Sequence, residues 1–160
     1  MNKANDPSLT SWISVSKDSD FPIQNIPFGT FKTEQLSPRV GSRIGDKVID
    51  LKTLFVLGYL DNLPFEASDF DTDTLNNLMK KGKNATRDLR GRISKLFNSE
   101  NHDLQENKHH IQQVVIDNDQ VEMLLPVQVG DYTDFYSSRD HATNVGTMFR
   151  DPDNALLPNW

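Results

Sequence analysis

The chain has 160 residues, a net charge of -6 and no cysteine, and these figures exclude several classes of protein. It is long enough for one ordinary domain, or one small domain with an appendage, but not for two full domains. Its 17 basic and 23 acidic residues include no basic run, so neither nucleic acid nor an anionic membrane is an expected partner. Without cysteine, a metal ion would have to be held by oxygen or imidazole. The polar N-terminus has no signal-peptide pattern and no segment approaches membrane-spanning length, so we expect a cytoplasmic protein.

The first third of the chain has the pattern of short strands joined by tight turns. β-branched and apolar residues predict strands at 12–15, 30–33, 39–44 and 47–50. Gly45 and Asp46 join the last two strands, and a two-residue loop with Gly first suits a type II′ turn, because Gly takes positive φ there without steric cost. Asp50 is placed to cap a short helix, and Gly58 to end it in a left-handed conformation.

Helical patterns dominate the middle of the chain. Residues 58–71 have no period and are predicted to be irregular, whereas Thr72 and Asp73 open a helix that Gly82 breaks. The next helix shares one apolar face among Leu89, Ile93, Leu96 and Phe97. Its basic residues, Arg87, Arg90, Arg92 and Lys95, lie elsewhere, and we interpret them as a solvated face in preference to an anion-binding patch.

Two further features precede a change in composition. His109 and His110 point about 100° apart on a helix, so they cannot chelate a metal from one face, and we expect an exposed pair. Short strands are predicted at 114–116 and 122–125, around a turn at 117–119. Pro126 then ends the apolar patterning, which predicts one domain at residues 1–126 and the start of another at 127–160.

Residues 131–150 carry more polar chemistry than any other stretch, with three Asp, two Arg, two Tyr and one His. Ser137 or Ser138 can cap a helix of residues 138–149, and Ser137 with Asp140 has the spacing of a capping box. On that helix His141 shares a face with Val145 and Met148. A histidine on an apolar face is more often a core residue than a catalyst, but acid, tyrosine, histidine and arginine meet here near one helix start. The residues alone leave both readings open.

Three stretches in the same order resemble one enzyme family. The first stretch lies within residues 131–160 and comprises Asp-Tyr-Thr-Asp-Phe-Tyr-Ser-Ser-Arg at 131–139, His-Ala-Thr-Asn-Val-Gly at 141–146, Met-Phe-Arg at 148–150 and Asn-Ala-Leu-Leu-Pro-Asn-Trp at 154–160. This stretch is similar to the start of the catalytic region of the fumarylacetoacetase family. Residues 20–31 and 39–51 resemble its N-terminal part. The resemblance implies a fold that is mainly β with short helices: an SH3-like β-barrel N-terminal domain, followed by the first segment of a β-rich catalytic domain.

The resemblance also implies a reaction and a site. These enzymes hydrolyse the carbon–carbon bond of 4-fumarylacetoacetate, a β-diketo acid, to fumarate and acetoacetate in tyrosine and phenylalanine catabolism, with Ca²⁺ or Mg²⁺ holding substrate oxygens. Asp134 matches a metal ligand and His141 the general base that activates water. Tyr136 and Arg150 match substrate-binding positions. A homodimer is implied for the full-length enzyme.

The family's enzymes extend far beyond the length of this chain, and their remaining carboxylate ligands come from that continuation. One carboxylate cannot supply the six or more oxygens that Ca²⁺ takes, so we expect an N-terminal piece of the enzyme, inactive by itself, whose partner is the remainder of the catalytic domain. Two alternatives stay open: a non-catalytic interaction or assembly module, and a related hydrolase that acts on another β-keto acid.

Overall fold

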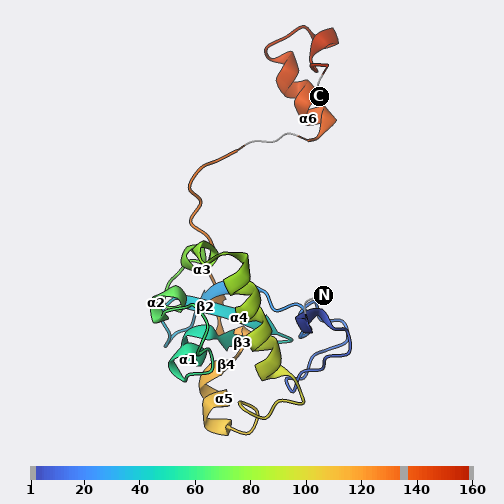
Figure 1. Cartoon of the computed structure of the whole chain (residues 1–160). Coiled ribbons are helices and arrows are strands. Elements are labelled where there is room, and N and C mark those ends of the chain that lie inside the picture. Colours follow the sequence, from blue (N-terminus) through green and yellow to red (C-terminus); the bar gives the residue numbers. More distant parts are fainter. Residues whose placement is uncertain (1–2, 134–136, 159–160) are drawn as a thin grey trace. The chain divides into compact units, whose positions relative to one another are not determined.

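The computed structural model describes residues 3–133 and 137–158, in two compact units, Met1–Gln128 and Val129–Trp160. Figure 1 shows both units. Along residues 3–133 and 137–158, no helix is both long enough and apolar enough to cross a membrane.

A five-stranded antiparallel sheet organises the first unit. Its strands are β1 (Phe28–Lys32), β2 (Arg39–Ile44), β3 (Lys47–Asp50), β4 (Val115–Asp117) and β5 (Glu122–Met123), in the spatial order β4-β3-β2-β1-β5. The sheet with its short helices confirms the predicted β-rich N-terminal domain. Strands β2 and β3 have the predicted bounds, and the strands predicted at 30–33, 114–116 and 122–125 differ at their ends by one or two residues.

The β2–β3 hairpin has the predicted turn. Gly45 has φ +55°, while Asp46 is not among the residues with positive φ, which is the pattern of a type II′ turn. A Cβ atom on Gly45 would also lie 2.9 Å from the carbonyl oxygen of Ser14. This position therefore needs glycine both for its backbone conformation and for the close approach of another segment.

The two edge strands of the sheet are consecutive in the sequence. Only residues 118–121, which include the 3-10 helix η2 (Asn118–Gln120), lie between β4 and β5. Five strands side by side separate the outer two by about 19 Å, and a link of four residues that contains a helical turn is too short for a flat sheet of that width. The sheet must curl to bring its edges together, so it forms a half-barrel.

Helices cover one face of the sheet and form the core with it. They are α1 (Leu51–Val56), α2 (Ala67–Phe70), α3 (Asn76–Lys80), α4 (Gly82–Phe97) and α5 (Lys108–Val114), and a 3-10 turn, η1 (Lys3–Asn5), precedes the sheet. Val40 and Ile49 of the sheet share one buried cluster with Leu89 and Ile93 of α4, which confirms the predicted apolar face of this helix. On the other face of the sheet, the buried ring of Phe31 lies over Gly41, where a Cβ would be 2.7 Å from the ring.

A buried ion pair joins the sheet to the first helix. Asp50 accepts hydrogen bonds from the amide and hydroxyl of Thr53, at 3.0 and 2.8 Å, so it caps α1 as predicted. Its carboxylate also lies 3.1 Å from Nη1 of Arg39, and the two side chains are 0% and 9% exposed. Gly58, with φ +80°, follows the end of α1 in the predicted left-handed conformation.

Three sequence predictions fail where contacts between distant segments decide the structure. The predicted strand at 12–15 is absent: Trp12 stacks on Phe97 of α4 and donates its indole N–H to the Leu96 carbonyl, so its side chain packs on a helix and the segment does not pair as a strand. Residues 58–71 are not wholly irregular, since a capping box formed by Glu66 begins α2. Helix α3 starts at Asn76 and not near residue 72.

Only one of the two histidines on α5 is exposed as predicted. His109 is exposed, but His110 is half-buried, and its Nδ1 lies 2.8 Å from the hydroxyl of Tyr59 and 3.0 Å from the side-chain amide of Asn107. Burial, with the nearby charge of Asp103, raises the pKa of Tyr59 above its ordinary value. The contact between Tyr59 and His110 therefore packs α5 against the segment that follows α1.

Candidate active site

The predicted catalytic stretch folds locally into a capped helix, α6 (Arg139–Thr147). Ser138 is the N-cap, with backbone φ -77° and ψ 124°, and its hydroxyl accepts a hydrogen bond from the His141 amide at 3.4 Å. The cap is therefore the second of the two candidate serines, and the capping box predicted for Ser137 with Asp140 is wrong. Asp140 instead lies in the first turn, where a negative charge favours the helix.

A close backbone contact joins α6 to the short 3-10 helix η3 (Pro152–Asn154). A Cβ on Gly146 would lie 2.0 Å from the carbonyl oxygen of Ala155, so only glycine permits this approach. Arg150 reinforces it, because Nη1 of this side chain donates to the same carbonyl oxygen at 3.1 Å. Asp151 caps η3 by accepting from the Asp153 amide at 2.9 Å.

The structure describes two of the four predicted site residues. His141 and Arg150 are both exposed, His141 in the first turn of α6 and Arg150 just after its end. Asp134 and Tyr136 lie outside the residues that the structure describes. On the helix face of His141, Met148 is 73% exposed and Val145 is half-buried.

The described residues do not form a metal site by themselves. Within 3–133 and 137–158, no three His, Asp or Glu side chains come close enough together to hold an ion. Ca²⁺ and Mg²⁺ take six or more oxygen ligands, and a site for either ion would need further carboxylates beside Asp134.

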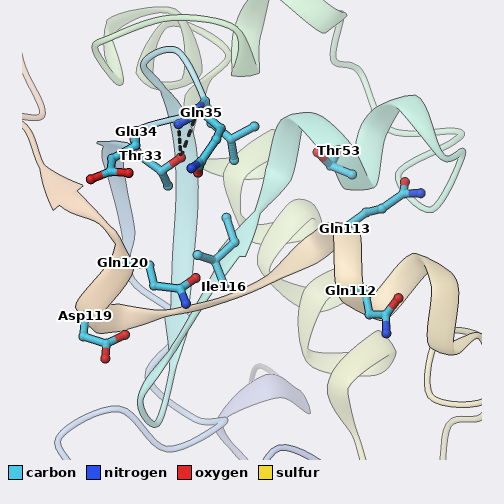
Figure 2. Close-up of a pocket in the computed structure, with 10 residues that line it drawn as sticks. Thr33, Glu34, Gln35, Thr53, Gln112, Gln113, Ile116, Asp119 and Gln120 are labelled. Carbon is cyan, nitrogen blue, oxygen red and sulfur yellow. Dashed lines mark hydrogen bonds between the residues drawn. The ribbon is translucent and has the colours of Figure 1, made fainter.

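The first unit contains a large polar hollow that the sequence analysis did not anticipate. It has a volume of about 870 Å³ and lies between the β1–β2 connection, α1, α5 and η2. Figure 2 shows Gln35, Gln112, Gln113 and Gln120 around it, and the hydroxyl oxygen of Thr33 accepts hydrogen bonds from the backbone amides of residues 35 and 36. These glutamines are scattered along the sequence and have no common motif, so no local signal predicts the hollow.

Comparison with known proteins decides the family of the chain. Residues 24–126 match the family described as Fumarylacetoacetase N-terminal. The chain belongs to the fumarylacetoacetase family. It is 45% identical over 153 residues to the fumarylacetoacetase of Dictyostelium discoideum, covering 95% of this chain and 36% of that protein. It is 45% identical to the Mus musculus fumarylacetoacetase and 42% identical to that of Homo sapiens, each over 151 residues, 94% of this chain and 36% of the relative.

Two facts follow for the fumarylacetoacetase resemblance. The alignments cover 95% and 94% of this chain, so the uncovered residues are fewer than the twenty residues of 131–150. The similarity therefore extends through the predicted catalytic stretch as well as the first unit. The chain spans little more than a third of the length of the curated fumarylacetoacetases that it matches.

Proposed function

We propose that this chain forms the N-terminal part of a fumarylacetoacetase, which hydrolyses 4-fumarylacetoacetate to fumarate and acetoacetate. The supporting observation is the similarity of at least 42% identity over 94% or more of the chain to curated fumarylacetoacetases, which spans the stretch containing His141. The proposal includes the assignment of residues 1–126 to the N-terminal domain and of 127–160 to the start of the catalytic domain.

In this proposal His141 is the general base. Capping by Ser138 fixes the first turn of α6 and so fixes the backbone from which the imidazole projects. A neutral imidazole takes a proton from water, the hydroxide adds to a carbonyl carbon of the substrate, and the adjacent carbon–carbon bond breaks. The departing enolate carbon then takes up a proton, which returns His141 to its neutral form and balances the hydrolysis.

Two other side chains would hold the substrate. Arg150 has guanidinium donors besides the one bound to the Ala155 carbonyl, and a fork of two N–H groups suits a substrate carboxylate. Tyr136 would donate its hydroxyl to a carbonyl or carboxylate oxygen. The bond to Ala155 gives Arg150 a second, positioning role, because it fixes the guanidinium beside the end of α6.

Asp134 would supply one oxygen ligand to Ca²⁺ or Mg²⁺, and the whole enzyme would have to supply the others. A divalent ion bound there would polarise substrate oxygens and favour departure of a carbon leaving group. We also infer a homodimeric, cytoplasmic enzyme of tyrosine and phenylalanine catabolism, on the family resemblance alone. We expect the 160-residue chain by itself to be inactive and to bind Ca²⁺ weakly; tight stoichiometric binding by calorimetry would contradict this ligand assignment.

The test of the catalytic assignment is a chimera of this chain with the remaining two thirds of the Dictyostelium discoideum relative. We expect His141→Ala to lower kcat about a hundredfold or more, with little change in thermal midpoint. His109→Ala, a change at another exposed histidine, is the matched control and should leave kcat unchanged. A stable His141→Ala chimera with near-normal turnover would exclude the general-base role.

The same chimera separates the two alternatives. If the chain is a non-catalytic assembly module, the folded chimera will have no hydrolase activity, while the first unit remains compact. If it belongs to a hydrolase of another β-keto acid, activity will appear with that acid and not with 4-fumarylacetoacetate.

A further inference from the structure

A groove with an apolar floor lies between α3 and α4, which adjoin each other in the first unit (Figure 1). Its volume is about 390 Å³. The floor consists of Phe28 from β1 and Leu75, Leu78 and Met79 from the α3 segment. Leu78 is buried in the core, whereas the Met79 side chain is 52% exposed at the edge of the groove. An apolar ligand of modest size could therefore displace water from this floor without any rearrangement of the core.

A row of cations borders this apolar floor. Lys83, Arg87 and Arg90 all line the groove, and their spacing of four and three residues puts them on one face of α4. The guanidinium of Arg90 is held in place by hydrogen bonds to the Asn5 side chain, at 2.7 Å, and to the Gln24 carbonyl. Arg90, the last residue of this row, is therefore already held in position before any ligand binds.

Arg87 is available to a ligand although it has an acidic neighbour. The Arg87 side chain is 59% exposed, and its Nε lies 3.3 Å from the carboxylate of Asp88, which is 53% exposed. An ion pair so open to solvent contributes little, so a ligand carboxylate can compete with it. In contrast, Arg92 on another face donates to the Tyr59 and Asp61 carbonyls and serves the fold.

The charge around the groove is opposite to that of the rest of the protein. Three of the 17 basic residues, Lys83, Arg87 and Arg90, and none of the acidic residues that the structure describes line the groove, so the rest of the chain, with 14 basic and 23 acidic residues, has a net charge of -9. A long polyanion or an anionic membrane would meet the acidic remainder and be repelled. A small anion that contacts only the groove would be attracted.

We propose that the α3–α4 groove binds a small organic carboxylate with an apolar body. The apolar body packs on Phe28, Leu75 and Met79, and the carboxylate lies against Lys83 and Arg87. The site is independent of the proposed catalytic residues, since all of its groups belong to the first unit. The basic residues at the start of α4 are then a ligand-binding face, and the interpretation of the helix as merely solvated applies to Lys95.

The test uses the 160-residue chain and three probes: octanoate, octanol and acetate. Octanoate combines the two features, octanol has only the apolar body and acetate has only the charge. Two-dimensional amide NMR should show octanoate shifting resonances of residues 75–90, with an affinity at least tenfold greater than that of either other probe. Raising the ionic strength from 0.02 to 0.5 M, a range chosen to shorten the screening length to a few ångströms, should weaken octanoate and leave octanol unaffected.

Variants assign the two halves of the site. Lys83→Gln and Arg87→Gln should each weaken octanoate about twofold to fivefold, the scale of a single exposed ion pair, without changing octanol. Lys95→Gln, on the same helix but outside the groove, is the matched control and should change neither affinity. Met79→Gln, at an exposed floor position, should weaken both octanoate and octanol.

Several results would overturn the proposal. Equal affinities for octanol and octanoate would remove the cationic half, and equal affinities for acetate and octanoate would remove the apolar half. Shifts centred outside residues 75–90, or an effect of Lys95→Gln as large as that of Arg87→Gln, would show non-specific attraction. Because these readouts are binding affinities of the isolated chain, they do not depend on whether the chimera hydrolyses 4-fumarylacetoacetate.

Discussion

Removing the buried carboxylate of Asp50 should be among the most damaging single changes in the first unit. The Asp50 side chain is fully buried, and it pairs with Arg39, which is 9% exposed. Asp50→Ala leaves a buried guanidinium without its counter-charge, which typically costs about 3–5 kcal/mol, and removes an N-cap worth about 1 kcal/mol. The total is smaller than the largest sum of these two costs, because Arg39 keeps its hydrogen bonds to Ser37 and its guanidinium stays partly satisfied. We therefore expect a loss of about 4 kcal/mol, or roughly 15 °C in thermal midpoint for a domain of this size.

Urea denaturation can measure this loss in the intact chain. Trp12 packs against Phe97 at a ring-centroid distance of 5.0 Å, so its fluorescence in a Trp160→Phe background reports unfolding of the first unit. Glu122→Ala is the matched control, because Glu122 pairs with Lys32 at 3.0 Å but is 66% exposed, and it should cost less than about 1 kcal/mol.

A double variant tests the cause of the loss. Arg39→Met with Asp50→Ala removes both buried charges, so it should be more stable than Asp50→Ala alone, since an unpaired buried charge costs more than an absent pair. A cost below about 1 kcal/mol for Asp50→Ala, or a double variant no more stable than the single one, would refute the reasoning. The first result would show that the pair is effectively solvated, and the second that the cap is the main contribution.

Three further changes test local features of the two units. Gly45→Val should lower the thermal midpoint much more than Lys47→Val, since only the first forces a β-branched residue into positive φ; equal midpoints would contradict the turn. Gly146→Ala should abolish the helical NMR signature of α6 without affecting the first unit, because the new methyl would collide with the Ala155 carbonyl oxygen, 2.0 Å away; an unchanged spectrum would exclude that contact. Burial raises the pKa of Tyr59, so above pH 10 the unfolded state loses this proton before the folded state does, and the free energy of unfolding should fall with rising pH. Tyr59→Phe should show a shallower fall between pH 9 and 11 in urea denaturation, and parallel curves would argue against the raised pKa.

The elements that the sequence predicts well are those whose signals lie within a few residues of one another. The β2–β3 hairpin follows from a Gly-Asp turn between two apolar strands, and α1 begins at the residue whose carboxylate caps it. The start of α3 is different, because the Leu75 amide donates to the carbonyl of Pro126 at 2.7 Å, and this contact between distant segments overrides the local signal at Thr72 and Asp73. Likewise, the aromatic stacking of Trp12 depends on Phe97 at the end of α4, more than eighty residues later.

The candidate site divides in the same way. The helix that carries His141 follows from local capping chemistry, although the sequence does not settle which of two neighbouring serines is the cap. The chemistry of His141 depends on groups that no local pattern specifies, and its assignment here comes from the family resemblance. The α3–α4 groove could not be predicted from the sequence either, because Phe28 and Arg87 are brought together only by the packing of a helix against the sheet.

The curl of the sheet has a consequence for synthesis of the protein. Strand β1 cannot pair on its outer side until Met123 has been made, about ninety residues after Phe31, its partner in the register. Until then, a growing chain leaves one side of β1 open, and an unpaired strand edge is a template for association with other chains. Closing so long a loop is also entropically slow. We expect truncation before residue 122 to favour aggregation over folding, although all but two of the sheet's strand residues would be present.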